Sequence, residues 1–267
     1  MKNILLLVHD DAGQEARLQA ALDIGRALQG HLTCLDVAIV PSLVGADYVG
    51  DAGFNLLLAD EREREATNRS VLEARLADEE VPWDWSDVIG ELPRCLENAS
   101  GLADLIVVNR ELDGFPLPDM RTTAGELIVR SNKPVLAVPE SLRRFDFGAA
   151  LVAWDGSPAA AAALRAAVPL LKLADRVVIV EIDDRSVIAP AEDAAAYLSR
   201  HDIHPIVQRV ARSNAGTAQT LLDLAASGEF GYVVMGGFGH QRFLEALFGG
   251  VTRTMLSKSP VPLFLAH

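Results

Sequence analysis

The stretch Ala149-Ala150-Leu151-Val152-Ala153-Trp154-Asp155 is an apolar run that ends in an aspartate, and an Ala- and Leu-rich segment follows it at 158–173. The same pattern occurs near the start of the chain, where Ile4–Asp10 is followed by a long Ala/Leu segment at 14–29. Short apolar runs that precede long amphipathic segments predict a buried strand followed by a helix. The chain therefore contains a repeat, and this repeat decides the fold.

The other apolar segments of the two halves match in the same order. Second strands are predicted at Leu32–Val37 and Val177–Ile182, third strands at Trp83–Ile89 and His204–Ala211, fourth strands at Ala103–Asn109 and Phe230–Gly236, and fifth strands at Lys133–Val138 and Val261–Ala266. Strands that alternate with helices predict a parallel sheet covered on both faces, with right-handed crossovers. Each half is thus predicted to be a doubly wound α/β domain with five strands in the order 3-2-1-4-5.

We expect the domains to span 1–140 and 148–267, because Pro, Ser and paired arginines interrupt the apolar pattern near Pro139–Gly148. Pro134 and Pro262 begin the fifth strands, and proline suits a sheet edge because it cannot donate to a ladder. Exposed edges need a cover. We therefore expect the halves to pack together through their fifth strands as an intramolecular pseudo-dimer.

The first half is the longer one, and two segments account for its extra length. Pro41–Gly53 is rich in Gly and Pro and is expected to form a loop. The charge run Glu61–Glu65 belongs to a long predicted helix. We interpret that run as a solvated helix face stabilised by i,i+4 ion pairs.

Composition and charge limit the kinds of partner. The chain has 267 residues, half of them apolar, and 24 basic against 37 acidic residues give a net charge of −13. This balance disfavours nucleic acid or an anionic membrane as the main partner. Cys34 and Cys95 show no metal or redox spacing, which fits a reducing compartment. The run Ile4–Val8 is too short for a signal peptide or a membrane span, so we expect a cytoplasmic protein.

A glycine-rich segment follows the fourth strand of the second half, with the spacing Gly236-x2-Gly239-x9-Gly249, and a helix is predicted at Thr254–Lys258. Glycines let main-chain N–H groups approach an anion, and a helix N-terminus adds positive potential. No Gly-Lys-Ser/Thr follows, and Arg242 stands where a dinucleotide fingerprint needs its third glycine. In a doubly wound sheet, Asp155 and this segment flank the crevice where the strand order reverses. The pattern predicts a site for nucleotide phosphates, with a simple tight loop as the alternative.

With these residues assembled, the whole chain resembles a tandem universal stress protein. Nucleotide-binding members of that family carry Gly-x2-Gly-x9-Gly-Ser/Thr after the fourth strand and an aspartate at the end of the first. The second half is similar, with Asp155-Gly156-Ser157-Pro158 and the glycine spacing above. The resemblance implies that this half binds ATP or another adenine nucleotide, with or without Mg²⁺.

The resemblance also implies which residues form that site. Asp155 would hydrogen-bond the adenosine, and Ile182 would contact the adenine through its backbone. Met235 and Gly236 would underlie the ribose and phosphates. Ala153 belongs to the same site and stands where some members have a proline. Main-chain N–H groups for the phosphates, with Thr252 nearby, would come from Gly239, Gly249, Gly250 and Val251.

Both halves depart from the family pattern. Gly250 replaces a hydroxyl residue, which removes a charge-assisted hydrogen bond worth roughly 1.5–3 kcal/mol. In the first half Asp10 is in place, but Asn109–Asp113 replaces the first glycines and Arg121-Thr122 replaces the later pair. We expect that half not to bind nucleotide in the same way and to contribute the partner surface instead.

Signals for catalysis are weak. The chain has no nucleophile elbow, no HExxH and no lysine in the glycine-rich loop, so we expect no catalytic or metal-ligating residues and at most slow ATP hydrolysis. The leading interpretation is a non-catalytic, nucleotide-binding stress regulator. The alternatives are a nucleotide-free module that binds an unknown protein partner, and a weak ATPase or adenylating relative. A homodimer stays open, because a tandem chain can satisfy its own dimer contact.

Overall fold

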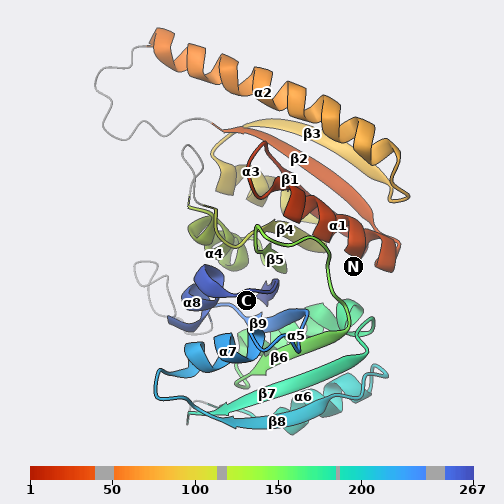
Figure 1. Cartoon of the computed structure of the whole chain (residues 1–267), viewed down its shortest axis with the longest axis vertical. Coiled ribbons are helices and arrows are strands. Elements are labelled where there is room, and N and C mark those ends of the chain that lie inside the picture. The colour runs from red at the N-terminus through yellow and green to blue at the C-terminus, as the bar shows by residue number, and fades with distance from the viewer. Residues whose placement is uncertain (40–50, 113–118, 185–186, 239–249) are drawn as a thin grey trace.

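Two similar α/β halves are joined edge to edge in this computed structural model, which describes residues 1–39, 51–112, 119–184, 187–238 and 250–267 (Figure 1). The elements of the first half are β1 Asn3–Val8, α1 Gln14–Leu28, β2 His31–Ile39, α2 Asp51–Ala77, β3 Trp83–Gly90, α3 Leu92–Ala99, the 3-10 turn η1 Ser100–Leu102, β4 Leu105–Asn109, α4 Met120–Arg130 and β5 Val135–Val138. Those of the second half are β6 Ala149–Trp154, α5 Pro158–Leu171, β7 Arg176–Asp183, α6 Ala191–Ser199, β8 Ile206–Ala211, α7 Thr217–Ala225, β9 Tyr232–Gly236, α8 Gly250–Lys258 and β10 Leu263–Ala266.

The described strands form one ten-stranded sheet in the order β3-β2-β1-β4-β5-β10-β9-β6-β7-β8. Each half therefore has the predicted order 3-2-1-4-5, with parallel neighbours throughout. The two fifth strands pair antiparallel, with Leu136 opposite Phe264. This pairing confirms the predicted pseudo-dimer, because it gives each Pro-preceded edge strand a partner.

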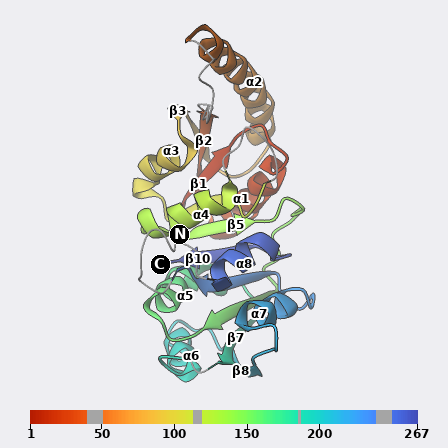
Figure 2. The ribbon, with the colours of Figure 1, turned by 90° about the vertical axis from the view of Figure 1, so that its left-hand side faces the viewer.

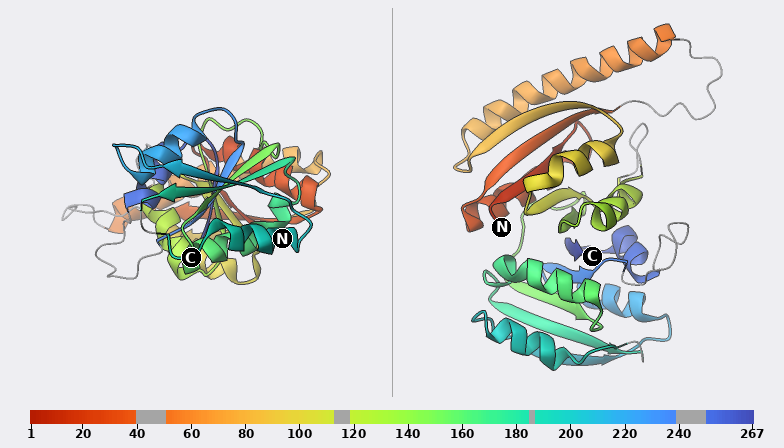
Figure 3. Two further views of the ribbon diagram at one scale, coloured as in Figure 1. Left: turned by 90° about the horizontal axis from the view of Figure 1, so that it is seen from below. Right: turned by 180° about the vertical axis from the view of Figure 1, so that it is seen from behind.

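Helices cover both faces of this strongly twisted sheet (Figures 2 and 3). Successive strand residues point to opposite faces, so Leu6 and Val8 join one core while Leu5 and Leu7 join the other. The first core packs under α1, α2, α5 and α6, and the second under α3, α4, α7 and α8. Each core contains residues of both halves, so the apolar interior runs across the junction.

Two predicted boundaries are wrong. Helix α2 begins at Asp51, so the end of the segment expected to be a loop, Pro41–Gly53, is helical, while 41–50 lie outside the described residues. Helix α8 begins at Gly250 rather than Thr254, so Gly250 and Val251 belong to its first turn. Among the helices that the structure describes, none is both long and apolar enough to cross a bilayer.

Truncation of Phe264 should destabilise both halves together. Its side chain is fully buried in the core next to the β5–β10 junction, and Phe→Ala changes in such positions cost about 3–5 kcal/mol. Urea unfolding of Phe264→Ala, followed by tryptophan fluorescence from Trp83, Trp85 and Trp154, should show this loss in one transition. Leu102→Ala, at a position 89% exposed, is the control and should leave stability nearly unchanged. Separate transitions for the two halves would contradict a shared core.

Candidate functional site

The predicted site of the second half lies at the carboxyl ends of β6 and β9, the two central strands of that half. Asp155 directly follows β6, and Gly236 ends β9. Ala153 lies within β6, and Ile182 is the buried penultimate residue of β7, which ends one residue later than predicted. This is the edge at which doubly wound sheets bind ligands.

The turn after β6 is held by its own side chains. Asp155 Oδ1 accepts a hydrogen bond from the Ser157 N–H at 2.8 Å, and Ser157 Oγ accepts one from the Ala160 N–H at 3.1 Å. Gly156 has φ +74°, and a Cβ there would overlap the backbone of Ala189. The turn thus has a structural role as a helix start, with Ser157 as N-cap of α5.

The segment before α6 packs against this turn. The Ile188 N–H donates to the Asp155 carbonyl at 2.7 Å, and Trp154 Nε1 donates to the Ala189 carbonyl at 2.9 Å. The main chain of Ile188 and Ala189 therefore packs directly against the Asp155 turn, on the side of α6.

Glycine at the end of β9 permits a very close approach of strand and helix. A Cβ on Gly236 would lie 2.5 Å from the backbone nitrogen of Ala160, so any side chain there would push β9 away from α5. The Gly237 N–H donates to the Ala266 carbonyl at 2.8 Å and extends the ladder with β10. Beyond it, the Phe238 N–H reaches Thr252 Oγ1 at 3.4 Å. These contacts place the end of β9 against α5 on one side and, through Phe238, against Thr252 of α8 on the other.

The other predicted phosphate ligands fall into two groups. Gly239 and Gly249 lie outside the described residues. Gly250 and Val251 occupy the first turn of α8, where main-chain N–H groups lack intrahelical acceptors and favour an anion. Gly250 is exposed, and a Cβ there would meet no atom of the described residues within 4 Å.

The equivalent position in the first half is occupied by His9, which corrects the assignment of Asp10. Leu6 pairs with Val107, two residues before the end of β4, and Val152 pairs with Val234, two residues before the end of β9. Three residues further along, the first half has His9 and the second has Asp155. The sequence match failed here because residues 9–13 connect β1 to α1, whereas only 155–157 connect β6 to α5.

In the second half Asp155 both follows the strand end and accepts the hydrogen bond of the turn. In the longer connection of the first half, His9 takes the position and Asp11 makes the hydrogen bond. Asp11 Oδ1 accepts from the Gly13 N–H at 2.7 Å, the same turn that Asp155 makes with Ser157. Asn109 takes the place of Gly236 at the end of the fourth strand. The first half therefore has side chains where the second half has bare backbone.

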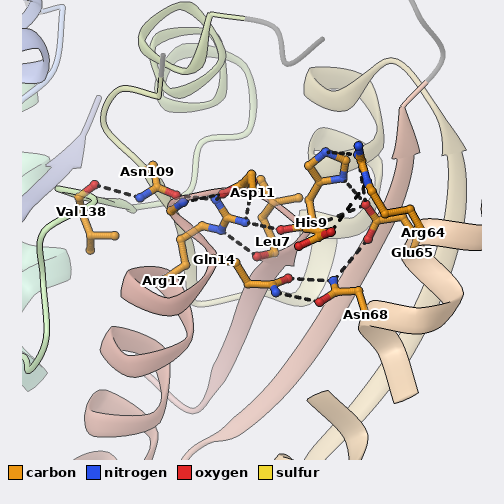
Figure 4. Close-up of polar contacts among 12 residues, drawn as sticks. Leu7, His9, Asp11, Gln14, Arg17, Arg64, Glu65, Asn68, Asn109 and Val138 are labelled. Carbon is orange, nitrogen blue, oxygen red and sulfur yellow. Dashed lines mark hydrogen bonds and ion pairs between the residues drawn. The ribbon is translucent and has the colours of Figure 1, made fainter. Parts of the chain in front are cut away.

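A buried arginine fills the crevice of the first half (Figure 4). Arg17 is fully buried and donates to the carbonyls of Leu7 at 3.0 Å and His9 at 3.1 Å. Its guanidinium also pairs with both carboxylate oxygens of Asp11, at 2.9 and 2.8 Å, and donates to Asn109 Oδ1. These bonds satisfy a buried cation with protein groups, which is consistent with the prediction that this half does not hold a nucleotide in the family manner.

A second polar cluster adjoins Arg17 and corrects the interpretation of Glu61–Glu65 as a solvated face: Arg62 and Glu63 are exposed, but Glu61 and Glu65 are not. Glu61 and Glu65 are 8% and 3% exposed, because the side of α2 that carries them faces His9. His9 Nδ1 lies 2.8 Å from Glu65 Oε1 and 3.8 Å from Glu61 Oε1. Arg64 Nη2 contacts Glu61 Oε2 at 2.7 Å.

This cluster shifts the acidity of two carboxyl groups. Burial, followed by the negative charges of Glu65 and Asp87, raises the pKa of Asp36 from 3.8 to about 7. Burial acts in the same upward direction on Glu65, but contact with the imidazole of His9 outweighs it and lowers the pKa of Glu65.

A family model described as the universal stress protein family matches residues 147–267. Residues 147–267 form a universal stress protein domain. The first half, residues 1–139, has the same fold, with its own five-stranded sheet in the same order. No curated protein matches the chain.

Solved structures extend the similarity in fold to the whole chain. A universal stress protein from Archaeoglobus fulgidus DSM 4304 aligns with 99% of this chain and 95% of its own, at 16% identity and a TM-score of 0.70. A functionally unknown protein, PA1789 of Pseudomonas aeruginosa PAO1, aligns with 100% of this chain and 92% of its own, at 16% identity and a TM-score of 0.62. A universal stress protein in complex with cAMP aligns with only 45% of this chain and 97% of its own, at 17% identity and a TM-score of 0.35. That last overlap is too small to show what this chain binds.

A side chain of the first half forms hydrogen bonds with α8, the last helix of the universal stress protein domain. Arg110 belongs to the segment Asn109–Asp113 that replaces the first family glycines, and it donates through Nη1 to the carbonyls of Leu256 at 3.0 Å and Ser257 at 2.6 Å. Both carbonyls lie in the last turn of α8, where a cation also complements the helix dipole. The departure from the glycine pattern thus contributes a contact between the halves.

Sequence reasoning missed the buried roles of Arg17, Glu61 and Glu65. A signal for the two glutamates was present, because Glu61, Glu65, Asn68, Leu72 and Leu76 follow helical spacing and all five are buried. Tracing the apolar Leu72–Leu76 face backwards along α2 would have placed the glutamates on the covered side.

Removal of Arg17 should cost much more stability than removal of an exposed arginine. Arg17→Met leaves the buried Asp11 carboxylate without its cation, and breaking such a pair costs about 3–5 kcal/mol. Arg26, 38% exposed and paired with Asp23 and Glu79, provides the control, with an expected loss below about 1 kcal/mol for Arg26→Met. Urea unfolding measures both. Equal losses would contradict the role given to Arg17.

The raised pKa of Asp36 predicts a pH-dependent difference from Asp36→Asn. The folded protein holds a proton that the unfolded chain releases, so this stabilisation is complete below about pH 4 and disappears as the pH rises through about 7. Asn keeps the shape without the charge, so the variant should gain on the wild type between about pH 5 and about pH 8. Urea unfolding at both pH values, with EDTA to exclude stray cations, tests this. A difference independent of pH would contradict it.

Proposed function

We propose that the chain is a stress-response protein whose universal stress protein domain binds ATP or another adenine nucleotide and acts as a non-catalytic regulator. The observation that carries the proposal is the pairing of two features at one sheet edge. The side-chain-free end of β9 at Gly236 lies there, and the glycine spacing leads from it to the first turn of α8.

The phosphates would be held by main-chain groups. The N–H groups of Gly250 and Val251, with those of Gly239 and Gly249 supplied by the intervening segment, would face the phosphate chain at the positive end of α8. Asp155 and the backbone of Ile182 would contact the adenosine, above Ala153 and Met235. Thr252 already accepts a hydrogen bond from Phe238, so it would act by shaping the loop.

The stoichiometry would be one nucleotide per chain. Arg17 and Asn109 fill the crevice of the first half with side chains that are satisfied by other protein groups. A ligand there would have to displace a buried ion pair.

A second candidate function is a nucleotide-free interaction module that binds a protein partner. It is favoured by the protein hydrogen bonds of Gly237 and Phe238 and by the packing of Ala189 over Gly156, since these groups need no ligand. The two candidates share a cytoplasmic location, which we infer from the scarcity of cysteine and the charge of the chain. Slow ATP hydrolysis would be compatible with the first.

A gain-of-affinity variant tests nucleotide binding without disturbing the fold. Gly250→Ser adds the missing hydroxyl at a position with free space, so its affinity for ATP should rise about tenfold or more. Gly250→Ala is the matched control, because it also removes the low helix propensity of glycine from α8 but adds no hydroxyl. Isothermal titration with ATP, with and without Mg²⁺, measures all three proteins.

Loss of affinity is tested with Asp155→Asn, which keeps the oxygen that accepts from Ser157 but removes the charge. We expect weaker ATP binding and an unchanged melting temperature. If neither the wild type nor Gly250→Ser shows saturable binding, the nucleotide proposal fails and the interaction module remains. Chromatography of small molecules released from freshly denatured protein would name the bound nucleotide.

A further inference from the structure

We infer that His9, Glu61 and Glu65 form a binding site for one divalent transition-metal ion such as Zn²⁺, in the first half of the chain. One imidazole nitrogen and one oxygen of each carboxylate lie within 4.8 Å of one another. All three residues are buried, and none of them belongs to the nucleotide site proposed above.

The spacing of these atoms suits tetrahedral coordination. Zn²⁺ bonds of about 2.0–2.1 Å place neighbouring ligand atoms roughly 3.4 Å apart. The distances from His9 Nδ1 to Glu65 Oε1 and Glu61 Oε1 are 2.8 and 3.8 Å, on either side of that value. Glu61 and Glu65 are four residues apart on α2, so both project toward the ring of His9.

Two of the atoms also lack a hydrogen bond. Glu61 Oε1 and His9 Nδ1 are buried and have no hydrogen-bond partner among the described residues, since the approach of His9 to Glu65 is close but does not have hydrogen-bonding geometry. An unpaired carboxylate oxygen in a residue that is 8% exposed is costly. A cation between the three groups would satisfy both atoms at once.

Surrounding groups orient the ligands. Glu65 accepts from Asn68 Nδ2 at 3.3 Å and from the Asp10 N–H at 3.2 Å. Asn68 is held in turn by two hydrogen bonds with Gln14, at 2.7 and 2.8 Å (Figure 4). Such outer hydrogen bonds fix the direction of metal-binding carboxylates.

Arg64 would compete with the ion. Its Nη2 is 2.7 Å from Glu61 Oε2 and 3.4 Å from His9 Nε2, so the arginine partly neutralises the same groups. Its side chain is 39% exposed and has Asp10 at 3.9 Å, so it can withdraw toward solvent when an ion enters. Removing this arginine should therefore tighten metal binding.

The donor set selects the ion. Mixed imidazole and carboxylate ligands suit Zn²⁺ and its neighbours, whereas Mg²⁺ and Ca²⁺ prefer oxygen alone. A bound ion would join α2 to the end of β1. It should raise the melting temperature by roughly 5 °C when its concentration is 100 times the dissociation constant.

Competition titration with a chromophoric chelator on the EDTA-treated full-length chain tests the site, with ZnCl₂ as the probe. We expect one Zn²⁺ per chain, at least tenfold weaker binding in Glu61→Gln and Glu65→Gln, and tighter binding in Arg64→Gln. Glu73→Gln is the matched control on the same helix, because the Glu73 side chain is 38% exposed and pairs with Arg69; the zinc affinity of this variant should equal that of the wild type. A millimolar excess of MgCl₂ should not displace the zinc.

Absence of stoichiometric binding, equal affinity in Glu61→Gln and the wild type, or displacement by Mg²⁺ would each overturn the proposal. If the glutamine variants fail to fold, zinc anomalous scattering from soaked wild-type crystals decides the question. A peak between His9, Glu61 and Glu65 supports the site, and a peak elsewhere or none refutes it. Nucleotide titrations of the Gly250 variants are read in the other half, so the two proposals can fail independently.

Discussion

Main-chain pairing between β5 and β10 is the interaction on which the rest of the structure depends. Each strand follows a proline and would otherwise end its own sheet with unpaired N–H and C=O groups. Their antiparallel union makes one sheet and lets both apolar cores cross the junction. It also reverses the second half relative to the first, so the last turn of α8 arrives at the edge where β4 ends and Arg110 can reach it.

The two halves satisfy the polar backbone groups at their strand ends in opposite ways. At the carboxyl edge of a doubly wound sheet, converging strand ends leave polar backbone that needs partners. The second half keeps glycine at this edge, so that Gly236 packs directly on α5 and main-chain groups stay near the surface. The first half supplies side chains instead, with Arg17 binding two strand carbonyls and Asn109 completing the cluster.

Strand order, the repeat and the junction were predictable because apolar runs mark buried strands and prolines mark edge strands, and both can be read from the local sequence. The register of His9 was not, because a longer connection after β1 shifts any alignment based on aspartates. Burial of Glu61 and Glu65 was also hidden, since a charge run resembles a solvated face until its partner is known. That partner, His9, directly follows β1 and is far away in sequence. Of the predicted glycines, Gly236 and Gly250 could be placed, whereas Gly239 and Gly249 lie outside the described residues.

The hydrogen bonds from Arg110 to the carbonyls of Leu256 and Ser257 have a consequence for how α8 is held. The carboxyl end of α8 is hydrogen-bonded to Arg110 of the opposite half, whereas its first turn contacts Phe238 of its own half through Thr252, so the two ends of this helix contact different halves of the molecule. Gly250 and the residues bound by Arg110 therefore lie at opposite ends of one helix. Arg110 thus links the last turn of α8 in one half to the strand end of β4 in the other.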